Sequence, residues 1–192
     1  MVDIPSHHMV YGTLRDYLTG QSILDTDDER YRQKIARVLV AEKGYNKQEI
    51  IPRLKIETLF NKNFVTSTID LVIVLATRRF IVIRYGPGSL VTRERPAIAA
   101  ARVLVPEYRI PYAVVTNGED AEFLETRTGK VLSQGLAGIP SRQEALALLK
   151  NCQFEAPPTG KRREQELRIL NAFNQEICCT GGPCVIPSSP EG

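Results

Sequence analysis

The first regular pattern in the chain is a helical repeat of apolar positions that begins just after residue 25. The repeat falls at i, i+4, i+7 and i+8, which is one face of a helix, and consists of Tyr31, Ile35, Val38 and Leu39. Thr26 followed by Glu29 is a capping-box pattern, which marks a helix start. Gly44 is a typical residue just beyond a helix end. We therefore expect a helix over residues 26–43.

Strand-like segments follow, joined by short connections. We expect strands over residues 49–60, 64–75 and 79–85, then a helix over residues 93–106 and a fourth strand over residues 111–116. Short connections between the first three strands favour antiparallel hairpins. The helix between the third and fourth strands makes that pair parallel, because parallel neighbours need a crossover. The second strand after Ile69 and the third strand are nearly all apolar, which indicates burial on both faces.

Smaller elements flank this core. We expect a hairpin from residues 122–126 and 130–133, a helix from Ser141 to about residue 149, and a last helix over residues 161–177. We divide the chain into an N-terminal arm or short helix (1–24), an α/β domain (25–150), a linker and C-terminal helix (151–177), and a tail rich in Cys, Gly and Pro (178–192). The order helix, three strands, helix, strand predicts an α/β fold with a central mixed sheet flanked by helices.

The composition narrows the class of protein. Of 192 residues, 43% are hydrophobic and 24% are charged, which is typical of a globular domain and excludes a disordered chain. The formal net charge of +3 permits a nucleic-acid partner without requiring one. No apolar run reaches the ~18 residues of a membrane helix, and the first nine residues lack the basic and apolar regions of a secretory signal. We therefore expect a cytoplasmic protein with no membrane partner.

The order of elements and four local sequences together resemble a known family. Those sequences are Asp27–Arg37, Ile69–Ile73, Phe80–Ser89 and Pro111–Gly118. Over about residues 25–150 the chain resembles the N-terminal domain of the R subunit of type I restriction enzymes. The resemblance implies the restriction-endonuclease-like, PD-(D/E)XK, superfamily with its αβββαβ core. The helicase part of a complete R subunit has no counterpart, because the chain holds no Gly-x-x-x-x-Gly-Lys-Ser/Thr loop.

The resemblance also says what an active site would need. Active members of the superfamily hydrolyse phosphodiesters with Mg²⁺ held by a strand Asp and by a Glu-x-Lys on the neighbouring strand. Asp70 matches the strand Asp and is the candidate metal ligand. The Glu and Lys positions fall on Val82 and Arg84, so one carboxylate is missing and a fixed cation replaces the lysine. We therefore expect weak Mg²⁺ binding at most, and a degenerate catalytic motif.

Three other acids are candidates for the missing catalytic carboxylate. Glu94 opens the helix after the third strand, Glu57 lies on the first strand, and Glu29 resembles an acidic residue that active relatives carry on the first helix. Each also has an ordinary explanation: Glu94 suits a helix first turn, Glu57 is a solvated strand residue, and Glu29 completes the capping box. Asp70 also has an ordinary explanation: its carboxylate could be solvated at the strand entrance or bonded to Arg84.

Basic residues are frequent around the same strands and the following helix: Arg78, Arg79, Arg84, Arg93, Arg95 and Arg102. Cations of this kind neutralise phosphates, so we expect nucleic-acid binding by Arg79, Arg84, Arg93 and Arg95, with DNA or RNA as the partner. A solvated face of paired charges is the ordinary alternative. Lys161–Arg163 is a second basic segment at the start of the last helix.

Three functional hypotheses follow. The preferred one is a nucleic-acid-associated protein with a nuclease fold and impaired catalysis. The second is an active Mg²⁺-dependent endonuclease in which Glu94 or Glu57 joins Asp70 and Arg84 steadies the transition state. The third is a non-catalytic structural or regulatory protein that binds a protein partner or a second copy of itself. A zinc site at Cys178, Cys179 and Cys184 is not favoured, because the paired Cys-x₂-Cys spacing is absent.

Overall fold

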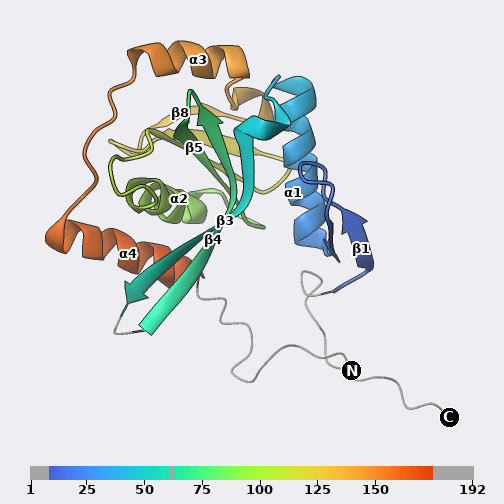
Figure 1. Ribbon diagram of the computed structural model, residues 1–192, viewed down its shortest axis with the longest axis horizontal. Coiled ribbons are helices and arrows are strands. Elements are labelled where there is room, and N and C mark those ends of the chain that lie inside the picture. The colour runs from blue at the N-terminus through green and yellow to red at the C-terminus, as the bar shows by residue number, and fades with distance from the viewer. Residues whose placement is uncertain (1–8, 61–62, 175–192) are drawn as a thin grey trace.

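A computed structural model describes residues 9–60 and 63–174. A six-stranded mixed sheet lies at its centre, with helices on both sides (Figure 1). In sheet order the strands are β3 (Ile50–Phe60), β4 (Asn63–Leu75), β5 (Arg78–Tyr85), β6 (Tyr112–Thr116), β7 (Ala121–Glu125) and β8 (Val131–Gln134). The predicted α/β fold with a central mixed sheet is therefore confirmed.

The strand directions follow from the connections. β3, β4 and β5 pair antiparallel, whereas β5 and β6 pair parallel across the helix α2 (Val91–Val103). Both relations agree with the prediction from connection length. The predicted hairpin of β7 and β8 extends the same sheet, since β7 pairs antiparallel with β6.

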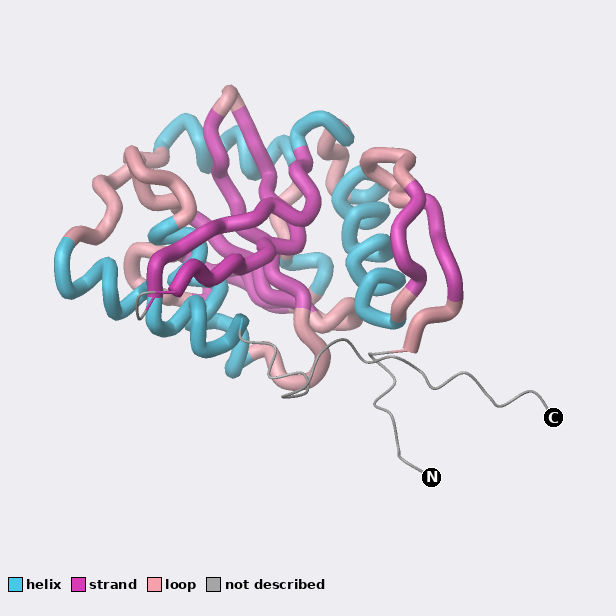
Figure 2. The backbone as a smooth tube through the Cα atoms, turned by 60° about the horizontal axis from the view of Figure 1, so that its bottom comes forward, coloured by secondary structure: helices cyan, strands magenta, loops and turns pink. Residues whose placement is uncertain are grey.

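Helices cover the two faces of this sheet (Figure 2). On one face, α1 (Asp27–Arg37) and α3 (Arg142–Asn151) contribute Ile35 and Ala145 to a core that includes Ile81. On the other face, the alanines of α2 and Leu170 of α4 (Gly160–Asn174) pack against Val82. Ile81 and Val82 both have 0% exposure, which confirms that this strand is buried on both faces.

The N-terminal segment differs from one of its two predicted forms. Residues before α1 form a separate two-stranded antiparallel hairpin, β1 (Gly12–Arg15) and β2 (Ser22–Asp25), so the short-helix prediction is wrong. Asp16 is the reason, because its Oδ1 accepts hydrogen bonds from the backbone N–H groups of Leu18 and Thr19 in the turn. Gly20 completes that turn at a φ of 73°, in the left-handed region that favours glycine.

Other boundaries differ by smaller amounts. α1 ends at Arg37 and continues as a π-helical turn, Val38–Glu42, rather than as a single helix to residue 43. The predicted end of the last helix and the cysteine tail lie outside the described residues. None of the described helices has the length and apolar content required to cross a bilayer.

Asp16→Asn should lower the free energy of unfolding at pH 7 by about 2 kcal/mol. Burial alone would raise the pKa of Asp16, but hydrogen bonds from Thr19, Arg53 and Gln33 together lower it from 3.8 to about 2. A carboxyl whose pKa is lowered by folding contributes stability above its unfolded pKa and loses it as the pH falls toward the folded value.

Urea unfolding of both proteins at pH 7 and at about pH 3 checks this prediction, because the difference should shrink by about half between them. An equal difference at both pH values would contradict it.

Candidate functional site

Asp70 lies within β4 and is only 7% exposed. Its Oδ1 accepts a hydrogen bond from Arg32 Nε at 2.6 Å, and its Oδ2 accepts one from the backbone N–H of Tyr85 at 2.9 Å. Arg84 Nε lies 3.5 Å from the same Oδ2. The solvated alternative for Asp70 is therefore wrong. The ion pair with Arg84 is present, and Arg32 adds a shorter one that the sequence did not indicate.

The strand register explains these neighbours. Leu71 pairs with Ile83, so Asp70 and Arg84 are the next opposed positions on β4 and β5. On the other side, the pairing of β3 with β4 skips Arg53, which has a φ of 50°. The register is the same on both sides of Arg53, so no residue is inserted, and its left-handed backbone changes the direction of the side chain.

The redirected side chain of Arg53 reaches toward α1 and the N-terminal hairpin. Its guanidinium donates to Asp16 Oδ2 at 2.6 Å and to Glu29 Oε1 at 3.2 Å. Arg53 therefore ties the sheet edge to two buried acids, and its guanidinium offsets the cost of burying them.

The first helix presents Glu29, Arg32 and Gln33 at i, i+3 and i+4, on one stripe. The Thr26 hydroxyl accepts a hydrogen bond from the Glu29 N–H at 3.2 Å, which confirms the predicted cap. The reciprocal half of the capping box is absent, because the Glu29 carboxylate accepts instead from Gln33 Nε2 at 2.9 Å. Glu29 Oε2 also lies 3.6 Å from Arg32 Nη1. Arg32 is thus shared between Glu29 and Asp70.

Arg93 completes the cluster from the first turn of α2. A Cβ added at Gly86 would come within 2.8 Å of Arg93 Nε, so the guanidinium lies directly over the glycine. Burial lowers the pKa of Arg84, and the neighbouring charges of Arg93 and Arg32 act in the same direction, against Asp70. Burial also acts to lower the pKa of Arg32, but the charge and hydrogen bond of Asp70 raise it overall.

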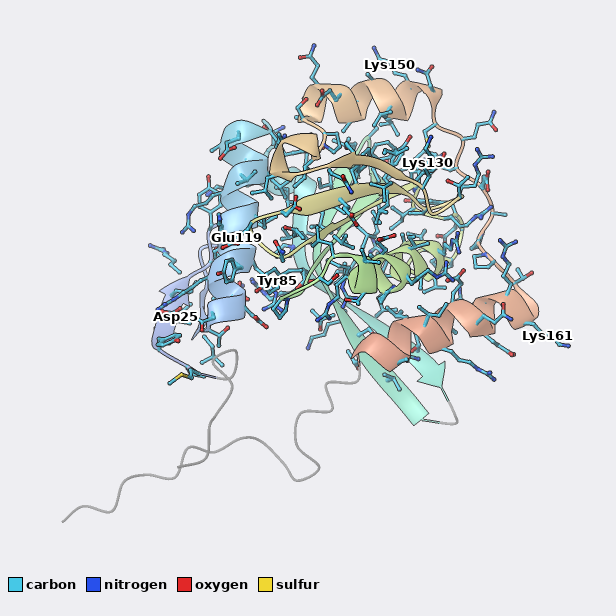
Figure 3. All side chains as sticks on the ribbon, turned by 180° about the vertical axis from the view of Figure 1, so that it is seen from behind. Asp25, Tyr85, Glu119, Lys130, Lys150 and Lys161 are labelled. Carbon is cyan, nitrogen blue, oxygen red and sulfur yellow. The ribbon has the colours of Figure 1, made fainter. Side chains whose placement is uncertain are left out.

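We call these five residues, Asp70, Glu29, Arg32, Arg84 and Arg93, the Asp70 centre. An aromatic pair flanks it: the rings of Tyr31 and Tyr85 stack with centroids 5.7 Å apart. Figure 3 labels Tyr85 beside α1. The Arg32 guanidinium carbon lies 5.4 Å from the Tyr85 ring centroid, within reach of a cation–π contact. The centre therefore joins three arginines, two acids and an aromatic wall.

The two other candidate acids lie elsewhere. Glu94 lies beside Glu122 of β7, and its pKa is raised by burial, by the charge of Glu122 and by a hydrogen bond with it. Glu57 is exposed and pairs with Thr66, four positions along β4 from Asp70. At the usual rise of a strand this is a separation of about 13 Å. Neither acid is described in contact with Asp70.

The candidate nucleic-acid-binding arginines also separate. Arg84 and Arg93 belong to the Asp70 centre. Arg79 pairs with Val74 near the other end of β5, about 16 Å along the strand from Arg84. Arg95 is exposed on α2 and lines a different groove. The structure thus brings Arg84 and Arg93 together and leaves Arg79 and Arg95 apart from them.

The sequence reasoning missed Arg32, Gln33, Arg53 and Asp16. The stripe of Glu29, Arg32 and Gln33 was a usable signal, because residues three and four apart share a helix face. The partner of that stripe on β4 lies 38 positions away from Arg32 and carries no local signal.

The side chains around Asp70 do not supply the ligands that a divalent cation needs. Mg²⁺ requires several oxygen ligands, but both Asp70 oxygens already accept from Arg32 and the Tyr85 N–H. Val82, at the position of the expected second acid, is fully buried against the helices α2 and α4. Within the described residues, no group of three or more His, Cys, Asp or Glu side chains could hold a metal ion. The excess of guanidinium groups around Arg84 favours an anion there.

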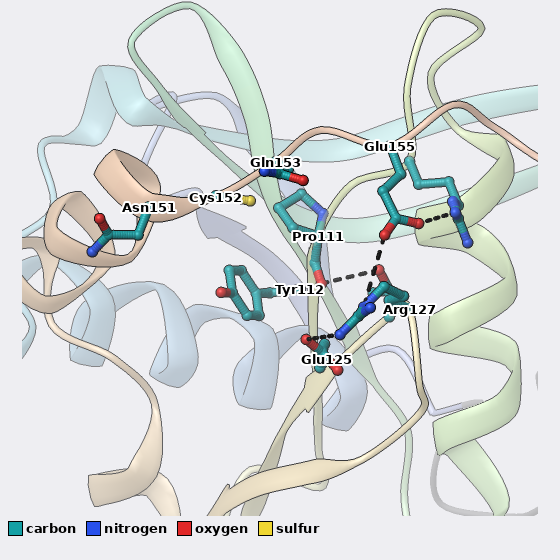
Figure 4. Close-up of a pocket in the computed structure, with 10 residues that line it drawn as sticks. Pro111, Tyr112, Glu125, Arg127, Asn151, Cys152, Gln153 and Glu155 are labelled. Atoms are coloured by element: carbon teal, nitrogen blue, oxygen red, sulfur yellow. Dashed lines mark hydrogen bonds and ion pairs between the residues drawn. The ribbon is translucent and has the colours of Figure 1, made fainter.

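A separate pocket of about 280 Å³ lies between β6, β7 and the segment after α3 (Figure 4). Its charges balance, because Arg127 lies 3.9 Å from Glu125 and 3.8 Å from Glu155, which also pairs with Arg109. Burial raises the pKa of the Cys152 thiol, and the two glutamates act in the same direction. The thiol therefore stays protonated near neutral pH and is a poor nucleophile.

Comparison with protein families gives a match over residues 27–140 to a model described as "Type I restriction enzyme R protein N terminus (HSDR_N)". No curated protein and no solved structure matches the chain. The matched range begins at α1 and includes the whole Asp70 centre, and it ends before α3 and α4.

Proposed function

Because the chain belongs to the family of type I restriction enzyme R protein N termini, we propose that it is a nucleic-acid-associated protein whose Asp70 centre contacts the phosphate backbone without a catalytic metal. The observation that carries this proposal is the bond from Arg32 to Asp70 at 2.6 Å. It places a guanidinium on the carboxylate that a nuclease of this kind needs for Mg²⁺. Catalysis by the superfamily mechanism is accordingly impaired.

The chemistry of the centre suits phosphate. Asp28 and Glu29 act on Arg32 together with Asp70. Around Arg84, however, the charges of Arg93 and Arg32 stand against Asp70 alone, so positive charge is in excess on that side. Guanidinium forks match phosphate oxygens in geometry and keep their charge at any physiological pH. Arg32 has a side-chain exposure of 29% and Arg84 of 14%, so a backbone phosphate would meet Arg32 and Arg93 first, with the charge of Arg84 beneath them.

Fluorescence anisotropy with a labelled DNA duplex tests the proposal. Arg93→Ala should weaken binding about tenfold at low salt and reduce the slope of log K against log salt by about one. Gly86→Ala should have a similar effect without removing a charge, since its methyl group displaces the Arg93 guanidinium. Lys150→Ala, an exposed change on α3, is the control. Absence of binding at low salt, or equal affinity of Arg93→Ala and the control, would contradict the proposal.

A second candidate function rests on the shared contact of Glu29 and Asp70 with Arg32. If Arg32 moved aside, these two acids would form a pair able to bind a divalent cation, as an active Mg²⁺-dependent nuclease requires. Cleavage of plasmid DNA by the unmodified protein in MgCl₂ or MnCl₂, abolished in Asp70→Asn, would support this candidate. An inactive protein under the same conditions would support the first.

A further inference from the structure

A second basic surface lies between α2, α4 and the turn after β7, outside the Asp70 centre. It is a groove of about 670 Å³. Its charged lining consists of five arginines and one carboxylate: Arg95, Arg102, Arg127, Arg162, Arg168 and Glu166. α4 lies beyond residue 140, so half of the groove is built from chain that the family match does not cover.

The single carboxylate of the groove is already neutralised at its floor. Arg102 is 7% exposed and pairs with Glu166 at 2.5 Å. Its other nitrogens donate to the backbone carbonyls of Thr126 at 2.8 Å and Arg127 at 3.1 Å. One buried arginine therefore joins α2, α4 and the turn after β7, and it fixes the spacing of the groove walls.

The rim of the groove is exposed and cationic. Arg95, Arg162 and Arg168 are exposed, and no ion pair holds them within residues 9–60 and 63–174. Arg127 is 63% exposed and keeps only long contacts, at 3.8 and 3.9 Å, to acids of the neighbouring pocket. Figure 3 shows the side chains of α4 projecting from the helix, which begins near Lys161. Four cations are therefore available to an incoming ligand.

The dimensions match a stretch of polyanion. Arg95 and Arg102 are seven residues apart on α2, and Arg162 and Arg168 are six apart on α4, which corresponds to about 10 and 9 Å. One strand of a duplex rises about 3.4 Å per phosphate along the helix axis, so a groove parallel to that axis would span about three phosphates. Ile169 is the single apolar residue in the lining, whereas docking of an acidic protein would require an apolar centre.

We propose that this groove is a second binding site for the phosphate backbone of a nucleic acid, formed by Arg95, Arg127, Arg162 and Arg168. It is a different site from the Asp70 centre and does not depend on that centre for its charge or shape. The partner class is the same, so the experiment must separate the two sites.

The test uses the full chain and a labelled 20-base-pair DNA duplex. Arg95→Ala/Arg162→Ala/Arg168→Ala should weaken binding at least tenfold and lower the salt slope by about two to three, because each lost phosphate contact contributes about one. The same loss should occur in an Arg93→Ala background, which removes a contact of the other site. Lys34→Ala/Lys55→Ala/Lys150→Ala, three exposed lysines outside the groove, is the charge-matched control. Thermal unfolding of each variant checks the fold.

Two results would overturn the inference. The first is equal affinity and equal salt slope for the groove variant and the lysine control. The second is binding of a polyglutamate peptide that is as tight as binding of the duplex and that the groove variant loses. The groove would then recognise an acidic protein. If Arg93→Ala alone is without effect while the groove variant fails to bind, the proposal for the Asp70 centre falls and this one stands.

Discussion

Arg102→Met should destabilise the protein by about 3–5 kcal/mol, the usual result when one partner of a buried ion pair is removed. Glu166 is 4% exposed and would be left in a buried site without its guanidinium partner. The carbonyls of Thr126 and Arg127 would lose donors as well. Urea unfolding at pH 7 measures the effect.

Arg168→Met is the matched control, because that side chain is exposed on the rim of the same groove and should change stability by less than about 0.5 kcal/mol. The double variant Arg102→Met/Glu166→Leu should recover much of the loss, since it removes both charges together. A loss for Arg102→Met no larger than that of the control would show that the pair does not hold α4 to α2.

Asp70→Asn should strengthen nucleic-acid binding while it weakens the fold. The substitution removes a negative charge from the midst of three arginines, so the positive potential at the centre rises. We expect affinity for the DNA duplex to increase several-fold, with a steeper salt dependence. Stability should fall by about 3 kcal/mol, because Arg32 and Arg84 lose their counter-charge.

The sign of the Asp70→Asn effect separates the two candidate functions. If Asp70 were the ligand of a catalytic metal, the same change would abolish cleavage and weaken Mg²⁺-dependent binding. Lys55→Ala, an exposed change on β3, controls for the loss of a strand residue's charge. Weaker duplex binding by Asp70→Asn in the presence of EDTA would contradict the anion-binding account.

Much of the fold was predictable because its signals are local. The continuous apolar runs of β4 and β5, the short hairpin connections and the helix before β6 together determine a mixed sheet. The hairpin of β1 and β2 was missed because its turn depends on one side chain, Asp16, which accepts from two backbone N–H groups.

The site was only partly predictable because its defining contacts are distant in sequence. Asp70 and Arg84 share a sheet register, which the strand assignments already imply. Arg32 reaches Asp70 from α1, and Arg53 reaches Glu29 from a position with a φ of 50°. Neither contact has a local pattern in the sequence. The position of Glu94 was not predictable either. Its neighbour Glu122 belongs to β7, and the place of β7 in the sheet order was not specified by the sequence.

Titration calorimetry of the purified protein with MgCl₂ tests most directly whether arginine has taken the place of metal at Asp70. We expect no saturable heat below about 1 mM Mg²⁺, because a single carboxylate already bonded to a guanidinium lacks the oxygen ligands that the ion requires. Stoichiometric uptake at lower concentration that disappears in Asp70→Asn would contradict it.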